Sequence, residues 1–136
     1  MTHERPTILL FEDDRSTREM YEYALRLAGF TVSVAADGLA GLRVIEQQLP
    51  DVIVLDLDLP QISGIDVHHE IVSHAETRRI PIVVVTGTNW KAPAGVFRTL
   101  RKPINSDVLV AVIQQALEEH GAQSPTDDAQ DRKGNE

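Results

Sequence analysis

The stretch DVIVLDLDLP, residues 51–60, contains an unbroken aliphatic run, VIVL, that leads into an aspartate. The run does not alternate with polar residues and is rich in β-branched side chains, which is typical of a parallel strand covered on both faces. The run IVVV at residues 82–85 repeats the pattern. We therefore predict strands over Asp51–Leu55 and Pro81–Val85 in a central parallel sheet.

Three further apolar runs have the length of a strand, and helical patterns lie between the runs. The first helix opens with Ser16 and Glu19 at the spacing of a capping box and stops at Gly29. An apolar stripe predicts a last helix over Ser106–His120. The remaining predicted strands are Thr7–Phe11, Thr31–Ala35 and Val96–Leu100, and weaker helical patterns place Leu42, Ile45 and Leu49 on one face before Pro50 and start another helix near Gly64.

Strands that alternate with helices predict a doubly wound α/β fold with helices on both faces of the sheet. The flavodoxin-like strand order, 2-1-3-4-5, is the expected one. The length of 136 residues fits one domain, predicted over residues 1–120, and the polar residues 121–136 are predicted to form a disordered tail.

The composition excludes several classes of function. The chain has no cysteine and a net charge of -8, which argues against disulfides, thiolate sites and a nucleic-acid partner. No apolar stretch approaches the roughly 20 residues of a membrane span, and no secretory signal precedes the first strand. We expect a cytoplasmic protein without a membrane partner.

Polar residues follow four of the predicted strands. In an open parallel sheet, ligands bind outside the carboxyl ends of the strands, so these residues are expected to converge on one edge. The first strand is followed by Glu12, Asp13 and Asp14, the third by Asp56 and Asp58, the fourth by Thr86 and the fifth by Lys102.

Carboxylates crowded at one edge repel each other unless a cation offsets them, and oxygen ligands of this kind suit Mg²⁺. Glu12 and Asp13 are the better ligands, because Asp14 has a second use at the start of the first helix. Asp56 is the best candidate nucleophile, since a carboxylate can attack a phosphoryl group. An ammonium and a hydroxyl would then neutralise the phosphoryl oxygens, and Lys102 and Thr86 fit those roles.

In these features the chain, from about Thr7 to Glu119, resembles the receiver domain of bacterial two-component response regulators. The segments ILLFEDD, DVIVLDLDLPQISG, PIVVVTG and RKP carry the resemblance. It implies that Asp56 accepts a phosphoryl group from a histidine kinase or a histidine phosphotransfer protein. It also implies that Asp13, Asp56 and the backbone carbonyl of Asp58 hold Mg²⁺, with Glu12 acting on the metal through water.

The same resemblance implies that Thr86 and Lys102 bond the new phosphoryl group and that the Lys102–Pro103 peptide is cis. It implies a protein that catalyses only its own phosphorylation and dephosphorylation and signals to a protein partner by conformational change. The downstream target, the cognate kinase, the lifetime of the phosphoryl group and a homodimer all stay open.

Two features depart from the family pattern. The segment between Thr86 and Lys102 is short, and its sequence TGTNWKAPAG is a poor helix former, so the fourth helix of the family is predicted to be shortened or absent. Thr99 stands where the family commonly has an aromatic switch residue. Trp90 and Phe97 lie in this altered stretch, where packing over the sheet is favoured over a replacement contact surface.

Two alternatives use the same residues differently. DLDLP also resembles the opening motif of haloacid-dehalogenase-type phosphohydrolases, but those enzymes place their further acidic pair after the lysine, whereas Glu12 and Asp13 precede Asp56. A pseudo-receiver that only binds partners is opposed by the intact set of site residues. The histidines of the third helix are expected to be solvated and not to bind metal; they are His68, His69 and His74.

Overall fold

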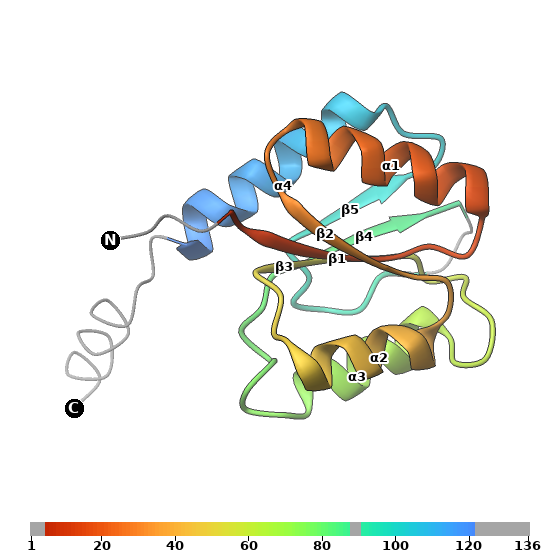
Figure 1. Cartoon of the computed structure of the whole chain (residues 1–136). Helices are drawn as coiled ribbons and strands as arrows, with labels where there is room; N and C mark the ends of the chain where they lie inside the picture. The colour runs from red at the N-terminus through yellow and green to blue at the C-terminus, as the bar shows by residue number, and fades with distance from the viewer. Residues whose placement is uncertain (1–4, 88–90, 122–136) are drawn as a thin grey trace.

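Five parallel strands form the centre of the computed structural model, which describes residues 5–87 and 91–121 (Figure 1). The strand order is β2-β1-β3-β4-β5, which confirms the predicted order. All four neighbouring pairs are parallel. The strands are β1 (Thr7–Phe11), β2 (Thr31–Ala35), β3 (Val52–Leu55), β4 (Ile82–Thr86) and β5 (Arg98–Arg101).

Helices cover both faces of this sheet. Figure 1 shows α1 and α4 on one face and α2 and α3 on the other. Successive residues of β1 point to opposite faces, so Ile8 and Leu10 pack with one pair of helices and Leu9 and Phe11 with the other. The helices are α1 (Arg15–Leu27), α2 (Gly38–Gln47), α3 (Gly64–Val72) and α4 (Ser106–Gly121). Among the helices described, none combines the length and apolar character that a bilayer crossing requires.

The predicted strands match β1 and β2 residue for residue, and the other three begin slightly later than predicted. β4 starts at Ile82 because Pro81 has no N–H to donate to the ladder, although its carbonyl accepts from the N–H of Ile53 at 3.0 Å. β5 starts at Arg98, and the preceding Val96 and Phe97 pack against the core clusters on opposite faces of the sheet.

Two details of the predicted helices are wrong. The first helix has no Ser16–Glu19 capping box; it is capped by Asp14, whose carboxylate accepts from the Thr17 N–H at 2.9 Å. The N–H groups in the first turn of a helix have no partner within the helix, and the Asp14 carboxylate, directly before α1, accepts from one of them. The second helix ends at Gln47, so Leu49 lies outside it and is 51% exposed instead of joining the buried face.

The connection from β4 to β5 has no helix in its described residues, Gly87 and 91–97. Val96 packs against the core cluster on the α2–α3 face and Phe97 against the cluster on the α1–α4 face, where its ring meets His120 edge-on. Phe97 thus packs over the sheet, as predicted. Trp90 and the predicted tail beyond Gly121 lie outside the described residues.

Candidate functional site

The register of the sheet brings two buried carboxylates together. β1 pairs with β3 so that Phe11 lies opposite Leu55, and each strand is followed by an acidic residue, Glu12 and Asp56. The backbone continues the ladder at this point, because the N–H of Asp56 donates to the carbonyl of Phe11 at 3.2 Å. The two side chains are only 2% and 3% exposed. The fold therefore holds two carboxylates side by side with little access to water.

Lys102 bridges these two carboxylates. Its Nζ lies 2.7 Å from Oε1 of Glu12 and 2.9 Å from Oδ2 of Asp56. The strand pairing aims it there, since Arg101 lies opposite Thr86 and the N–H of Lys102 donates to the Thr86 carbonyl at 3.0 Å. The Lys102–Pro103 peptide is cis, as the family resemblance implied.

Hydrogen bonds from a backbone N–H and from an arginine side chain hold the loop after β1. The N–H of Asp14 donates to Oε2 of Glu12 at 3.1 Å, and Nη1 of Arg18 donates to the carbonyls of Glu12 and Asp13 at 3.1 and 3.2 Å. Arg18 was missed from the sequence. The sequence did contain a signal for it: an arginine close to the start of a helix lies at the positive end of the helix dipole, which is unfavourable unless other groups bind the guanidinium.

The loop after β3 forms a hydrogen bond with the Asp56 side chain. The N–H of Asp58 donates to Oδ1 of Asp56 at 2.9 Å. A turn follows in which Gln61 has φ of 73° and the N–H of Ile62 donates to the carbonyl of Pro60 at 2.9 Å. This left-handed conformation at a non-glycine residue had no signal in the sequence.

Gly64 then brings the start of α3 against the backbone of Asp56. A Cβ at this position would lie 2.3 Å from the carbonyl oxygen of Asp56 and 2.4 Å from Cα of Leu57. Both contacts are with backbone atoms, which cannot swing aside. The glycine therefore allows α3 to pack closely on this loop.

Burial and ion pairing shift the pKa values of this cluster in opposite directions. Burial raises the pKa of the Glu12 carboxyl above its ordinary value, although hydrogen bonds from Lys102 and the Asp14 N–H oppose the shift. Burial alone would lower the pKa of the Lys102 ammonium, but its hydrogen bonds to Glu12 and Asp56 outweigh burial and raise that pKa. The ammonium thus stays charged between two carboxylates.

Glu12, Asp13 and Asp56 could together hold a metal ion, because one carboxylate oxygen from each lies within 4.8 Å of the other two. When all three are ionised, the Lys102 ammonium, which contacts Glu12 and Asp56, offsets one of the three negative charges and leaves two. A divalent cation would offset that charge. The donors are all carboxylate oxygens, the ligand type of Mg²⁺, so the residues present fit this ion.

A family model described as the response regulator receiver domain matches residues 8–114. The chain belongs to this family. Receiver domains of this family are modules of two-component response regulators and not catalytic enzymes. The match opposes the phosphohydrolase alternative, since it covers the strands and the acidic cluster together.

Individual relatives agree with the family match. The receiver domain is 35% identical over 130 residues to the transcriptional regulatory protein AfsQ1 of Streptomyces coelicolor, covering 91% of this chain and 56% of AfsQ1. A putative response regulator from Chloroflexus aurantiacus superposes with a TM-score of 0.78 at 32% identity, covering 84% of this chain and 98% of that one. A CheY-like receiver from Methanospirillum hungatei, with a TM-score of 0.79 at 23% identity, covering 88% of this chain and 99% of that one, supports the fold. The chain spans about half or less of the length of the curated relatives it matches.

Other predicted residues of the receiver domain lie as follows. Thr86 ends β4 and is 2% exposed. Thr99 is exposed on β5. His68 is buried, contrary to the expectation of a solvated histidine face, and burial lowers its pKa with a smaller effect from His69. α3 ends at Val72, so His74 follows the helix and does not belong to it as predicted. In the described residues, none of these three histidines belongs to a cluster able to hold a metal.

Proposed function

We propose that Asp56 accepts a phosphoryl group from the phosphohistidine of a sensor histidine kinase or phosphotransfer protein. One observation supports this most: Asp56 is 3% exposed at a strand end, with an ammonium 2.9 Å from its Oδ2 and two further carboxylates beside it. In the transfer, a carboxylate oxygen of Asp56 attacks phosphorus, and the bond from phosphorus to the donor's imidazole nitrogen breaks. The product is an acyl phosphate, and the phosphate state of Asp56 becomes the signal to a protein partner.

The neighbouring residues of this chain would prepare that step. Asp58 holds Oδ1 of Asp56 through its N–H, which fixes the orientation of the nucleophile. Lys102 would move its hydrogen bond from Oδ2 to an incoming phosphoryl oxygen, and the Thr86 hydroxyl would donate to another. A bound Mg²⁺ would neutralise charge on the phosphoryl oxygens. Its ligands in this proposal are Asp13, Asp56 and the carbonyl of Asp58, with Glu12 acting through water.

The test uses a small phosphodonor. The chain is incubated with acetyl phosphate and Mg²⁺ and analysed by intact-mass spectrometry beside Asp56→Asn. We expect the wild type to gain the mass of one phosphoryl group and the variant to gain none, because an amide is not a nucleophile here. A gain that persists in Asp56→Asn, or no gain in the wild type, contradicts the proposal.

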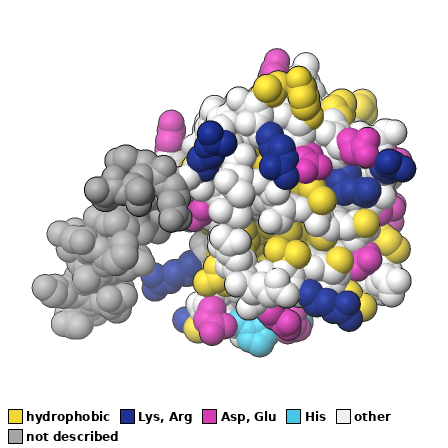
Figure 2. Space-filling model, in the orientation of Figure 1, with side chains coloured by type: hydrophobic (Ala, Val, Ile, Leu, Met, Phe, Trp, Pro, Cys, Tyr) yellow, Lys and Arg dark blue, Asp and Glu magenta, His cyan; other side chains and the backbone are white. Residues whose placement is uncertain are grey.

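A surface on α1 supports a protein donor. Met20, Tyr23 and Leu27 are 48%, 67% and 70% exposed and share one helix face at i, i+3 and i+7. Figure 2 shows hydrophobic side chains along the top of the molecule, where α1 and the start of α4 lie in Figure 1. Because α1 begins directly after the acidic loop, a kinase that docks on this α1 stripe stands beside Asp56. We place this exchange in the cytoplasm, where kinase domains hold ATP.

The proposed docking of a kinase on the α1 stripe leads to a separate prediction. Tyr23→Ala is expected to slow phosphoryl transfer from a donor kinase about tenfold, because a large aromatic side chain at a contact surface often dominates binding. Phosphorylation by acetyl phosphate is expected to stay unchanged, since the small donor needs no docking. Both rates are measured by phosphate-affinity gel electrophoresis. Equal slowing with both donors would place the defect in the site and contradict the docking role.

A further inference from the structure

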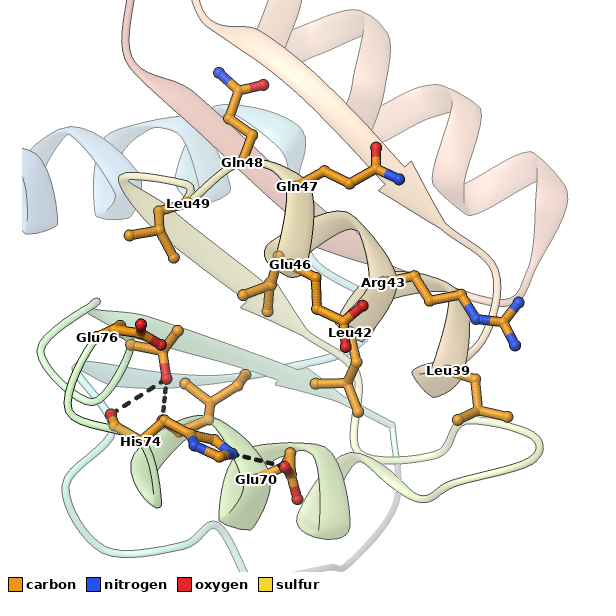
Figure 3. Close-up of a pocket in the computed structure, with 13 residues that line it drawn as sticks. Leu39, Leu42, Arg43, Glu46, Gln47, Gln48, Leu49, Glu70, His74 and Glu76 are labelled. Carbon is orange, nitrogen blue, oxygen red and sulfur yellow. Dashed lines mark hydrogen bonds and ion pairs between the residues drawn. The ribbon is translucent and has the colours of Figure 1, made fainter.

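A groove of about 560 Å³ runs between α2 and α3 and the segments that follow them, and the phosphoryl chemistry uses none of its residues (Figure 3). Its floor is apolar: Leu42 is half-buried, and Ile45 and Ile71 are 8% and 2% exposed. Leu39 and Leu49 extend the apolar surface at its two ends and are 40% and 51% exposed. Figure 3 shows Leu39, Leu42 and Leu49 directed from α2 and its continuation toward α3.

The rim of this α2–α3 groove is acidic. Three carboxylates line it, on Glu46, Glu70 and Glu76, against one guanidinium on Arg43. His74 also lines it and bonds Glu70 at 2.8 Å, and it is charged only when protonated. In Figure 3 the Arg43 side chain extends away from Glu70 and His74, and Figure 2 shows acidic side chains beside a histidine at the lower edge of the molecule.

We propose that the α2–α3 groove binds an amphipathic helix of a partner protein that carries aliphatic anchors on one face and lysine or arginine beside them. The aliphatic anchors match the leucine floor, and the basic residues match the carboxylate rim. A helix suits the groove better than an extended peptide, because the residues that line it come from α2, α3 and the segments after them, and none belongs to a strand whose edge could pair with a peptide backbone.

The length of the groove sets the length of the occupant. Leu39 and Gln47 are eight helical steps apart on α2, which corresponds to about 12 Å at 1.5 Å per residue. An occupant lying along α2 therefore contacts it over about two to three turns, with anchors at i, i+4 and i+7.

A second copy of this chain is a poorer occupant. Its exposed apolar helix face is the α1 stripe, where Arg15 is paired with Glu19 and Arg26 with Glu22. This face brings no excess of positive charge to the acidic rim. The contact would also be head to tail and would not close into a dimer.

The test uses the unphosphorylated chain, so it does not depend on the proposed phosphoryl transfer. The probe is a fluorescein-labelled peptide of about 15 residues, with leucines at i, i+4, i+7 and i+11 and lysine and alanine elsewhere. Its controls are the same peptide with glutamate in place of lysine and a permuted peptide that has no leucine stripe. Binding is measured by fluorescence anisotropy at physiological salt.

The variants Leu49→Ser and Glu46→Lys change exposed side chains of the groove, and Leu27→Ser and Glu118→Lys are matched changes on α1 and α4. We expect each groove variant to weaken binding about tenfold and each matched variant to leave it unchanged. Circular dichroism and thermal unfolding check that all four remain folded. Binding of the glutamate or permuted peptide with equal affinity, equal losses in the matched variants, or no binding would overturn the proposal.

The position of the peptide is checked by amide chemical-shift perturbation. Shifts concentrated on α2 and α3 support the groove, and shifts concentrated on the α1 stripe overturn it. Sedimentation of the chain alone tests the remaining occupant, because self-association that Leu49→Ser abolishes would assign the groove to a second copy instead.

Discussion

Lys102 carries the charge balance of the site, since its ammonium contacts both buried carboxylates. Removing one partner of a buried ion pair leaves the other charges without compensation. We therefore expect Lys102→Met to lower the free energy of unfolding by about 2 kcal/mol at neutral pH, below the usual 3–5 kcal/mol for a fully buried pair because the lysine side chain is 24% exposed. Chemical denaturation in EDTA measures the change.

The same variant has a defined pH dependence. Because burial raises the pKa of Glu12, the folded state holds its proton more tightly than the unfolded state does, so Glu12 lowers stability as pH rises from 4.5 through its folded-state pKa. Without Lys102 this loss grows. The deficit of Lys102→Met should be small near pH 4 and largest at neutral pH; a deficit that is constant with pH, or one equal to that of exposed Lys91→Met, would contradict this account.

Gly64 lets α3 contact the site directly, because the start of α3 packs against the backbone of Asp56. Gly64→Ala would place a methyl group 2.3 Å from the Asp56 carbonyl oxygen, so the loop or the helix must shift. We expect a loss of about 1–3 kcal/mol in the free energy of unfolding and slower phosphorylation by acetyl phosphate. Urea denaturation and intact-mass kinetics measure the two effects.

Gly87→Ala is the matched control for this prediction. Gly87 also follows a strand at the site, but its Cβ would meet Lys102 Cβ at 3.6 Å, an ordinary contact. Its phosphorylation rate and stability should stay close to those of the wild type. If Gly87→Ala slowed phosphorylation as much as Gly64→Ala does, close packing under Asp56 would not explain the effect.

At the scale of elements, strands were easier to predict than helix ends. β3 and β4 are continuous aliphatic runs of strand length that are rich in β-branched residues, which is the pattern of a strand covered on both faces. The start of α1 was predicted wrongly because Asp14 and Ser16 both have side chains able to cap a helix, and the sequence does not say after which of them the helix begins. Leu49 was misjudged because its apolar spacing fits a helix that ends two residues earlier, at Gln47.

The site could be predicted as a set of residues but not as an arrangement. Strand ends indicated that Glu12, Asp56 and Lys102 would converge, because parallel strands end at one edge. The clamp of Arg18 on two backbone carbonyls and the left-handed Gln61 depend on how the loops fold over that edge. Such contacts have no period in the sequence and arise only once the strands are in register.

Considered as a whole, the molecule places the two surfaces that we propose for partners on opposite faces of the sheet. The acidic cluster lies at the strand ends with the α1 stripe beside it, and the α2–α3 groove lies on the other face of the sheet. α3 begins against Asp56 and also forms a wall of the groove. A phosphoryl group on Asp56 would thus act on a helix that both the site and the groove share.

Binding of Mg²⁺ should stabilise the whole fold, because the unfolded chain does not hold Glu12, Asp13 and Asp56 together. A ligand at 100 times its dissociation constant adds about 2.7 kcal/mol to the free energy of unfolding, and we expect an increase of this order relative to EDTA. Asp13→Asn should abolish the increase at little cost in EDTA, since Asp13 is exposed, whereas Glu118→Gln should retain it. Thermal unfolding over a range of Mg²⁺ concentrations measures the effect. Equal stabilisation of Asp13→Asn and wild type would mean that Mg²⁺ acts at some other place on this acidic chain.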